Sequence, residues 1–355
     1  MNILVLTPYM NGFGGTEQVI ANFCDAFKLV ATADMHLKVV DLGGTENGDW
    51  AAGRPIEIVT MAQNKRVRTI QYALTLYSRI SKLIKADDYD FVISTNPLMW
   101  SMAKTVTTHR HLKAQVVAWY HYSLSRKPVR PALLSRADWY FAISSGIQQE
   151  LIDAGIQPDR VKLIYNPIKA QPTVIARTSE APRRFVYMGR TLLDGQKNLR
   201  ELLLAFADVS GEWQLDVYGD GADRERAPEF ATELGINDHI YWHGFTEAPW
   251  AQIKQADTLL LTSRYEGFPM VLVEALSQGV YVISSDCPTG PRDIINGENG
   301  RLYQLGDVAT LTSLLTGVIS GTLELPDQHA LQQSVSQFYL PAYMTHVLNA
   351  LSSMK

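Results

Sequence analysis

The chain has 355 residues, of which 46% are hydrophobic and 19% are charged, and its formal net charge is −4 at pH 7. A chain of this length is too long to fold around one typical hydrophobic core, and it suits two α/β domains of roughly 150 to 180 residues each. No segment offers the ~18 uninterrupted apolar residues of a membrane span, which argues against a transmembrane protein. Cys24 and Cys287 are far apart in the sequence and lack metal-ligand spacing, which argues against a disulfide framework and against a zinc site.

The charges are unevenly distributed along the chain. Residues 1–170 hold 19 Lys and Arg against 14 Asp and Glu, a net charge of +5, and the remainder carries −9. Such a difference arises from ordinary solvated charge, or it indicates that the N-terminal half faces an anionic partner, either a phosphorylated acceptor or a membrane surface. We expect no nucleic-acid partner and no exposed aromatic wedge beside the bases, which cluster at residues 65–68, Arg79, Lys82, Lys85 and residues 126–130.

The first residues predict a buried strand. Residues 3–7 form an apolar run that leads directly into a turn, and no basic residue precedes them. A secretory signal peptide would carry a basic segment before its apolar core. We therefore expect a cytoplasmic protein, with peripheral contact at the inner face of the cell membrane as the alternative that the basic half leaves open.

Short β-branched runs alternate with helical patterns along nearly the whole chain, which predicts an α/β fold with parallel sheets built from β-α-β units. The expected strands of the first half are residues 3–7, 37–42, 91–94, 116–119, 139–143 and 162–165. Those of the second half are residues 185–188, 214–218, 240–242, 258–262 and 281–284. Each set predicts one doubly wound sheet, whose ligands would bind beyond the carboxyl ends of the strands.

A proline-containing stretch at residues 166–184 separates the two sets of strands. It has little hydrophobic periodicity, so we interpret it as a linker and place the domain boundary near residue 170. Residues 1–170 then form the N-terminal domain and residues 171–333 the C-terminal domain. Residues 334–355 predict a helix whose apolar face carries Phe338, Tyr339, Tyr343, Val347 and Leu351.

The strongest functional segment is residues 263–279. It follows an expected strand, turns at Gly267 and continues into a helix that begins near Pro269. Glu266 then lies in the loop and Glu274 lies on the helix, so both carboxylates can face a ligand at the helix N-terminus, together with the backbone of residues 267–271. Carboxylates accept hydrogen bonds from vicinal hydroxyls, which suits a sugar or a ribose. The alternative is two Glu side chains that only complement the helix dipole.

A second segment, residues 188–199, joins an expected strand to an expected helix. The strand ends at Gly189, the loop carries Arg190 and Lys197, and the helix begins near Asn198. Two cations beside a helix N-terminus suit an anion, particularly a diphosphate. Solvated loop charges are the alternative.

Three further segments are weaker indications. Gly14 and Gly15 follow the first strand and would let a ligand approach the backbone, although the run is not the dinucleotide-binding pattern and a tight turn without a ligand is equally consistent. His121 ends an apolar strand, where a single histidine is often structural. Tyr218 and Gly219 end another strand and are a further candidate, with a turn that binds no ligand as the alternative.

Together these segments resemble the retaining GT-B glycosyltransferases of family 4, over nearly the whole chain. The most specific feature is the spacing of Glu266 and Glu274, supported by the Gly-Arg and Lys-Asn pairs of residues 189–198. The segments are similar to those of bacterial lipopolysaccharide core α-1,6-galactosyltransferases, which share Gly-Phe-Gly-Gly at residues 12–15. The loop between Arg190 and Lys197 is two residues longer than is usual in the family.

The resemblance implies a fold and roles for single residues. Two Rossmann-like domains would face each other across a cleft, and the C-terminal helix would cross back to the N-terminal domain. Catalytic roles would fall to His121 near the transferred sugar, to Glu266 at its hydroxyls and to Arg190 and Lys197 at the diphosphate. The donor would also contact Gly14, Gly15, Gly189, Tyr218, Gly219, Gly267, Phe268, Pro269, Met270 and Val271, and Glu274 would bind the ribose.

The resemblance also implies an activity, the retaining transfer of galactose or glucose from a UDP-sugar to a glycan or glycolipid acceptor such as lipopolysaccharide core. A catalytically silent subunit that binds a nucleotide sugar or a partner glycosyltransferase is one alternative, and a UDP-sugar epimerase of GT-B shape is another. Many transferases hold a divalent metal at the donor site with an Asp-x-Asp motif, and we assign no such motif in this sequence. We therefore expect no metal and no cofactor, and the cations and helix N-termini would stabilise the leaving diphosphate.

Overall fold

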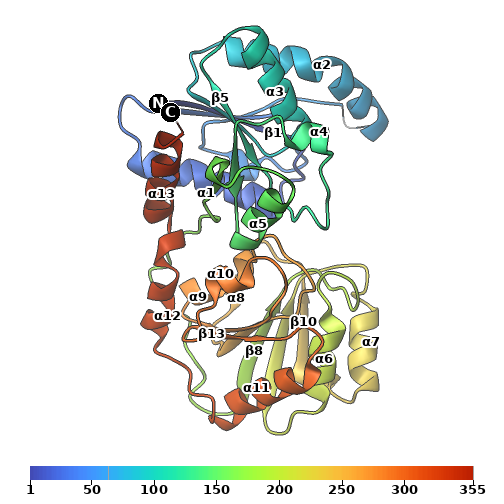
Figure 1. The fold of residues 1–355 in the computed structure, drawn as a ribbon. Helices are drawn as coiled ribbons and strands as arrows, with labels where there is room; N and C mark the ends of the chain where they lie inside the picture. The colour runs from blue at the N-terminus through green and yellow to red at the C-terminus, as the bar shows by residue number, and fades with distance from the viewer. Residues whose placement is uncertain (63, 355) are drawn as a thin grey trace. The chain divides into compact units, whose positions relative to one another are not determined.

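The computed structural model describes residues 1–62 and 64–354. The chain divides into two compact units, of which unit 1 comprises Met1–Lys169 and Phe338–Lys355 and unit 2 comprises Ala170–Gln337. Each unit is built on its own parallel sheet with helices on its faces (Figure 1). The predicted α/β fold with two parallel sheets is therefore confirmed. Among the described residues, every helix is too short or too polar to cross a membrane.

Unit 1 contains a sheet of seven parallel strands in the order β3-β2-β1-β4-β5-β6-β7. The strands are β1 (Asn2–Thr7), β2 (His36–Asp41), β3 (Ile56–Ile58), β4 (Phe91–Ser94), β5 (Gln115–Trp119), β6 (Trp139–Ala142) and β7 (Val161–Leu163). The chain moves outward from β1 in one direction and then returns to add β4 on the other side. The order of the strands therefore reverses between β1 and β4, and ligands of such sheets bind at this position.

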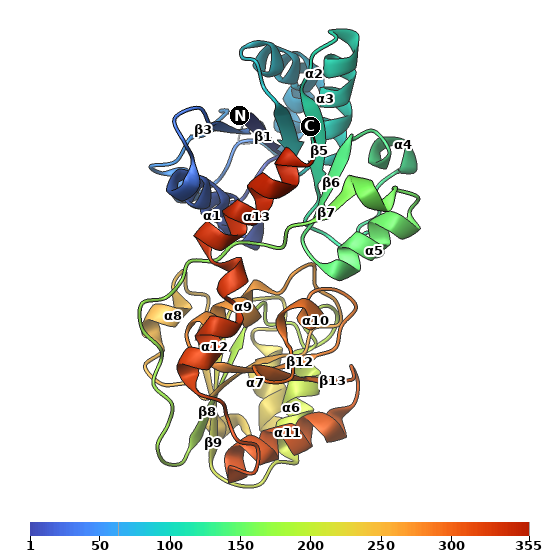
Figure 2. The ribbon, with the colours of Figure 1, turned by 60° about the vertical axis from the view of Figure 1, so that its left-hand side comes forward.

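The helices of unit 1 cover both faces of its sheet. They are α1 (Gly15–Val30), α2 (Lys65–Lys85), α3 (Pro97–His109), α4 (Pro131–Leu134), α5 (Ser145–Asp153) and α13 (Leu340–Ser352). α13 runs beside α1 in both views (Figures 1 and 2), and α2 packs against α3. Among the described residues of unit 1, side-chain caps define three helix starts, since backbone N–H bonds are accepted by Asn64 at α2, by Asn96 at α3 and by Ser144 at α5.

Unit 2 contains a sheet of six parallel strands in the order β10-β9-β8-β11-β12-β13. The strands are β8 (Arg183–Met188), β9 (Trp213–Tyr218), β10 (Ile240–Gly244), β11 (Thr258–Leu261), β12 (Tyr281–Ser285) and β13 (Gly300–Tyr303). The order reverses between β8 and β11, where Leu260 pairs with Tyr187. The edge strands β3 and β13 were not predicted, because one has only three residues and the other is interrupted by Gly and Arg.

Helices also cover both faces of the unit 2 sheet. They are α6 (Leu199–Ala207), α7 (Arg226–Glu233), α8 (Pro249–Gln252), α9 (Met270–Ser277), α10 (Pro291–Ile294), α11 (Val308–Ser320) and α12 (Gln328–Ser334). α6 packs with α11 and α9 packs with α12 (Figure 2). The apolar strands β11 and β12 are buried along their whole length, so the middle of the sheet forms the centre of the core.

The expected linker is more ordered than its proline content suggests, because the part that belongs to unit 2 is bonded to that unit. The Ile175 amide donates to the carbonyl of Gln278 over 2.8 Å, and the Thr178 side chain donates to the buried carboxylate of Asp257. Asp257 also accepts the backbone N–H of Arg184 at 2.8 Å. The buried carboxylate therefore ties the entry of the chain to the middle of the sheet.

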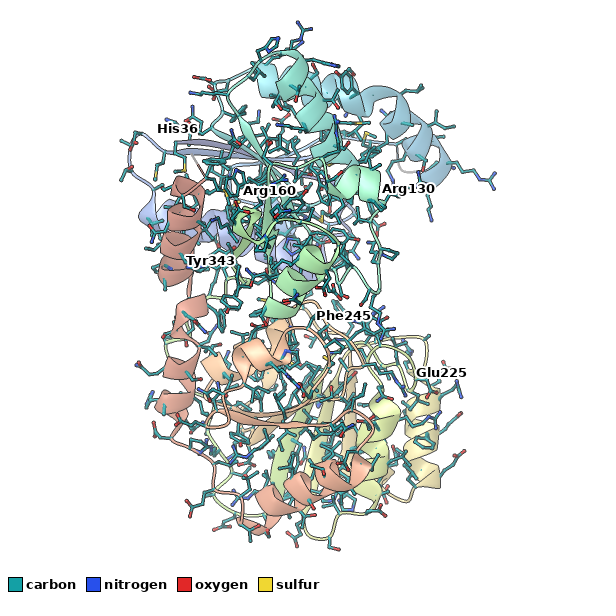
Figure 3. All side chains as sticks on the ribbon, in the orientation of Figure 1. His36, Arg130, Arg160, Glu225, Phe245 and Tyr343 are labelled. Atoms are coloured by element: carbon teal, nitrogen blue, oxygen red, sulfur yellow. The ribbon has the colours of Figure 1, made fainter. Side chains whose placement is uncertain are left out.

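The C-terminal segment is not the single helix that its periodicity predicts over residues 334–355. α12 ends at Ser334, and the chain then pairs with Ile168, whose N–H donates to Phe338 O and whose carbonyl accepts the N–H of Leu340. These bonds require an extended backbone, which interrupts the helix before α13. Tyr343 on α13 is labelled in Figure 3, and its ring lies 6.5 Å from that of Phe23 on α1.

Candidate active site

Two of the predicted functional segments meet at the carboxyl edge of the unit 2 sheet. β8 and β11 are neighbours at the position where the strand order reverses. Residues 189–198 follow β8 and lead into α6, and residues 262–269 follow β11 and lead into α9. Loops at such a position form the usual ligand site of a doubly wound sheet.

A buried ion pair joins the two loops. Nζ of Lys197 lies 2.7 Å from Oε1 of Glu266, and the two side chains are only 14% and 11% exposed. Gly189 lies against the same lysine, because a Cβ at this position would come within 3.4 Å of Lys197 Cε. An ion pair that is shielded from water interacts more strongly than a surface pair, so each partner holds the other in place.

Backbone contacts fix the longer loop that carries Lys197. The hydroxyl of Thr262 donates to the carbonyl oxygens of Lys197 and Asn198 at 3.1 Å, and the Arg264 amide donates to Gln196 O at 2.8 Å. Asn198 precedes α6 with φ +50°, a left-handed conformation that Asn tolerates better than most residues. These contacts hold Lys197 against the loop after β11, although its own loop is two residues longer than the family resemblance leads us to expect.

Arg190 differs from Lys197 in its surroundings. Its side chain is exposed, and its guanidinium donates to the side-chain oxygen of Gln196. Its carbonyl accepts a hydrogen bond from the buried Tyr187 hydroxyl at 3.0 Å, which fixes the backbone while the cation faces outward. Arg190 can therefore reorient toward an arriving anion, whereas Lys197 is already held.

Gly219 allows the loops after β8 and β9 to approach each other. Its φ is +138°, and a Cβ here would lie 1.9 Å from the carbonyl oxygen of Gly189, so a side chain cannot be accommodated. The adjacent Tyr218 is buried, and its ring stacks on that of His243 with centroids 4.2 Å apart. His243 in turn places Nε2 2.6 Å from Asp216. His243 therefore packs against the residue that precedes Gly219, a contact that its sequence position did not indicate.

The N-terminus of α9 is available to a ligand. Within the described part of the chain, no side chain caps the helix, so its first N–H groups are left for another acceptor. The preceding loop is held from behind, because the Thr289 hydroxyl donates to the Glu266 carbonyl and a Cβ at Gly290 would lie 2.4 Å from Pro269 Cδ. Of the predicted loop residues, Phe268 and Pro269 are buried and Gly267, Met270 and Val271 are partly exposed.

Glu274 lies on α9, half-buried, and accepts a hydrogen bond from the indole N–H of Trp250 at 3.2 Å. Burial raises the pKa of the Glu274 carboxyl group, and the bond from Trp250 opposes that shift. A half-buried carboxylate with one bonded oxygen can still accept a hydrogen bond on the other. Sequence reasoning missed Trp250, because its contact depends on how α8 packs on α9.

The remaining predicted site residues belong to unit 1. α1 begins at Gly15, and its N-cap Gly14 lies so close to Glu17 that a Cβ would meet Oε2 at 2.6 Å. The buried Glu17 accepts the Gly12 N–H at 3.0 Å, so a carboxylate already complements part of this helix N-terminus. Gly15 is unobstructed, since a Cβ there would meet no atom of the described chain within 4 Å.

His121 lies two residues beyond β5, with its ring 4.7 Å from that of Trp119. Burial lowers the pKa of His121 to about 3, so its imidazole is neutral near pH 7. Its Nε2 is buried and finds no partner among the described residues, and the same is true of the hydroxyls of Thr7 and Thr95. Thr7 and Thr95 follow the paired residues Leu6 and Ser94, so unsatisfied polar atoms gather where the strand order of unit 1 reverses.

One Asp-x-Asp sequence does occur outside the functional segments, at residues 88–90, and the sequence-based expectation of its absence was wrong. Asp90 directly precedes β4 and accepts the backbone N–H of Asn2 at 2.8 Å, and Asp88 pairs with Lys113 at 2.8 Å. Both carboxylates thus lie at the amino edge of the sheet, opposite the ligand edge. Within residues 1–62 and 64–354, no group of three or more His, Cys, Asp or Glu side chains is placed to hold a metal ion.

Both halves of the chain match glycosyltransferase family models. Residues 175–337 match the model described as glycosyl transferases group 1, and residues 13–171 match the model of glycosyltransferase family 4. The two matches therefore cover unit 2 and most of unit 1.

Full-length relatives agree with these matches. The chain is 32% identical to the lipopolysaccharide 1,6-galactosyltransferase of Escherichia coli over 100% of both sequences, and 32% identical to that of Salmonella typhimurium over 99% of both. The solved lipopolysaccharide outer core galactosyltransferase WaaB matches with a TM-score of 0.87 and 30% identity over 100% of both chains. Anabaena HepE in complex with UDP shares the fold, with a TM-score of 0.77 at 17% identity over 99% of this chain. The chain therefore belongs to the GT-B glycosyltransferases that the two family models describe.

Proposed function

We propose that this glycosyltransferase moves galactose or glucose from a UDP-sugar to a lipopolysaccharide core or a related cell-surface glycan, with retention of the anomeric configuration. The observation that carries the proposal is the buried pair of Lys197 and Glu266 beside the uncapped N-terminus of α9. It combines a cation, a carboxylate and free N–H groups at one edge of a sheet. The names of the full-length relatives support the choice of galactose and of lipopolysaccharide.

The chemistry divides between the residues as follows. When the bond between the sugar and the diphosphate breaks, negative charge develops on the phosphate oxygen and positive charge on the anomeric carbon. Lys197, Arg190 and the α9 N–H groups would stabilise the leaving diphosphate, and Glu266 would accept hydrogen bonds from hydroxyls of the sugar. Glu274 would bind the ribose. The acceptor hydroxyl would attack from the face that the diphosphate leaves and would pass its proton to the departing diphosphate oxygen, which balances the transfer and retains the configuration.

In unit 1, the backbone at Gly14 and Gly15 would approach the donor, and His121 would contact the transferred sugar. The neutral ring and the unpaired Nε2 of His121 support this assignment, because a buried polar atom without a partner is uncommon unless a ligand completes it. A neutral imidazole can donate or accept one hydrogen bond without adding charge near the developing cation.

A donor screen tests the activity. The purified chain would be incubated with UDP-galactose, UDP-glucose and a truncated lipopolysaccharide acceptor, and UDP release would be measured with and without the acceptor. A transferase releases UDP in proportion to the acceptor. An epimerase would convert the donor without one, and a silent subunit would bind the donor without turnover.

We also propose that transfer needs no divalent metal. The support is that Lys197, Arg190 and a helix N-terminus already supply positive charge to the diphosphate, and that Asp88 and Asp90 are engaged at the opposite sheet edge. Activity in excess EDTA should stay within about twofold of the untreated rate. Complete loss in EDTA with recovery in Mn²⁺ would contradict this proposal.

A peripheral contact with anionic membrane is a further proposal. The residues that support it differ from those that the sequence suggested. α2 contains six basic and no acidic residues, and its large apolar side chains Val67, Ile70, Leu74 and Tyr77 are 52%, 61%, 78% and 44% exposed. Their spacing of three and four residues places them on one stripe of the helix, with Lys82 and Lys85 exposed on the same helix. The expectation that no aromatic residue is exposed beside the bases was therefore wrong.

Arg79 does not belong to this stripe, because its Nη1 lies 3.6 Å from Met61 Sδ on the inner side of α2. At low salt, the double variant Lys82→Glu, Lys85→Glu should bind vesicles containing anionic lipid at least about thirtyfold less than wild type, since each of the two bases contributes ~1 kcal/mol near such a surface. The double variant Lys28→Glu, Arg110→Glu makes the same charge change at two exposed sites outside α2 and should bind normally. Equal sedimentation of wild type with neutral and anionic vesicles would refute the contact.

A further inference from the structure

A cavity of about 490 Å³ lies in unit 1 at the carboxyl ends of β2 and β3. Its lining is formed by Tyr9, Gly43, Gly44, Thr45, Glu46, Ile58, Val59, Thr60, Met61, Ala62 and Arg68. This volume is within the range of small-ligand sites, and the carboxyl edge of a doubly wound sheet is where such sites form. None of these lining residues belongs to the donor site proposed above.

The cavity shares its wall with the loop that leads to Gly14. The Met10 N–H donates to Gly44 O at 3.2 Å, and a Cβ at Gly43 would lie 1.9 Å from the backbone nitrogen of Tyr9. The two loops can therefore approach only because Gly43 lacks a side chain. A ligand in the cavity would lie beside the loop that approaches the donor in the proposed function.

Polar groups of the lining form a connected set. The guanidinium of Arg68 lies 4.0 Å from the centre of the Tyr9 ring, and the Tyr9 hydroxyl is hydrogen-bonded to the carboxylate of Glu46. Among the described residues, no carboxylate pairs with Arg68. Arg68 can therefore bind an incoming anion without breaking an ion pair, and Glu46 can accept hydrogen bonds from neighbouring hydroxyls.

The electrostatics of the cavity favour an anion. The first turn of α2, which contains the lining residue Arg68, has no acidic residue, although a helix N-terminus is stabilised by negative charge. The arrangement costs helix stability unless an anion binds there. From the same helix, Arg79 reaches the sulfur of Met61, which lines the cavity.

Asp41, the last residue of β2 and two residues before Gly43 of the lining, does not cancel this positive charge. Asp41 is fully buried, accepts the N–H of Gly43 at 2.9 Å, and has one oxygen without a partner in the described chain. Burial raises the pKa of Asp41 to about 8, so the group is largely protonated near pH 7. Of the described residues that line the cavity, only Glu46 is acidic.

We propose that this cavity binds an anionic substituent, phosphate or carboxylate, of the acceptor saccharide, with Arg68 as its ligand and Glu46 and Tyr9 at the adjacent sugar hydroxyls. The inference rests on the proposed function for the identity of the ligand as an acceptor. It adds a substrate class, because it requires the acceptor to carry a negative group close to the sugar that is glycosylated.

Two variants separate the cavity from general surface charge. Arg68→Gln removes the cation that lines it, and Arg66→Gln makes the same change two residues earlier, at an exposed position that does not line it. Binding is measured by ligand-observed NMR with glucose 6-phosphate, glucuronate and neutral glucose as probes. Wild type and Arg66→Gln should bind at least one anionic probe more tightly than glucose, and Arg68→Gln should lose about tenfold of that affinity.

The kinetic arm uses the transfer assay. Arg68→Gln should raise the acceptor KM about tenfold and leave the donor KM within about twofold, while Arg66→Gln should change neither. Two treated acceptors identify which group is bound, one with its phosphate removed enzymatically and one with its carboxylates reduced. The treatment that removes the bound group should raise the acceptor KM of wild type to that of Arg68→Gln, and the other treatment should not. Equal probe binding by all three proteins, or equal affinity for glucose, would overturn the inference. A wild type that binds the probes without any transfer would refute the proposed function and leave the cavity assignment standing.

Discussion

Replacing Glu266 with Ala should lower kcat about tenfold or more and leave the donor KM within about threefold, because the lost hydrogen bonds to the sugar involve a charged group worth ~1.5–3 kcal/mol. Lys197→Ala should lower kcat at least as much. Each single change leaves a partner with 14% or less of its side chain exposed and without its opposite charge. The double variant should therefore be far less impaired than the product of the single effects.

A matched ion pair between the loop that carries Lys197 and the start of α6 provides the control. Asp194 and Arg200 lie 3.0 Å apart but are 61% and 32% exposed, and surface pairs contribute little. Asp194→Ala should therefore keep both kinetic constants within about twofold. Wild-type turnover in Glu266→Ala, or strictly multiplicative effects of the two single changes, would remove the assignment of this pair to the reacting centre.

Glu274→Ala should raise the donor KM about tenfold or more with kcat nearly unchanged, because the ribose is bound alike before and during transfer. Burial raises the pKa of Glu274, so its carboxylate becomes protonated at a higher pH than that of an exposed glutamate. As pH falls through this raised pKa, the hydrogen-bond acceptor is lost and the donor KM should rise. Glu274→Gln should have a raised KM throughout and lack this pH dependence.

Trp250→Phe should cause a smaller rise in the donor KM, since it removes only the bond of 3.2 Å that orients one oxygen of Glu274. Glu229→Ala changes an exposed carboxylate on α7 and should have no effect on either constant. Equal donor KM values for wild type and Glu274→Ala across the pH range would show that Glu274 is not at the ribose.

The sequence was sufficient for the fold and for the positions of the two loops that follow β8 and β11. Apolar runs such as residues 91–94 predict strands because a sheet covered on both faces buries every side chain, and the loops after residues 188 and 262 follow from Gly and charged residues at strand ends. The family resemblance was carried by the spacing of Glu266 and Glu274, and the full-length relatives confirm it.

The contacts that build the site could not be predicted. Lys197 and Glu266 are 69 residues apart in the sequence and meet only because β8 and β11 are neighbours in the sheet. The sequence does not reveal this strand order. Trp250 reaches Glu274 through the packing of α8, and the cavity beside Arg68 depends on a close approach at Gly43. The interruption before α13 arises from pairing with Ile168, which a helical periodicity cannot reveal.

The central claim is retaining transfer of a hexose, and analysis of the product tests it most directly. UDP-galactose labelled in the sugar would be incubated with the purified chain and a truncated lipopolysaccharide core, and the product would be examined by mass spectrometry and NMR. We predict that the acceptor gains one hexose, that UDP appears in equal amount, and that the new linkage has the α configuration of the donor. A β linkage would contradict retention. Conversion of the donor to its epimer, or UDP release that does not depend on the acceptor, would contradict the proposed transfer itself.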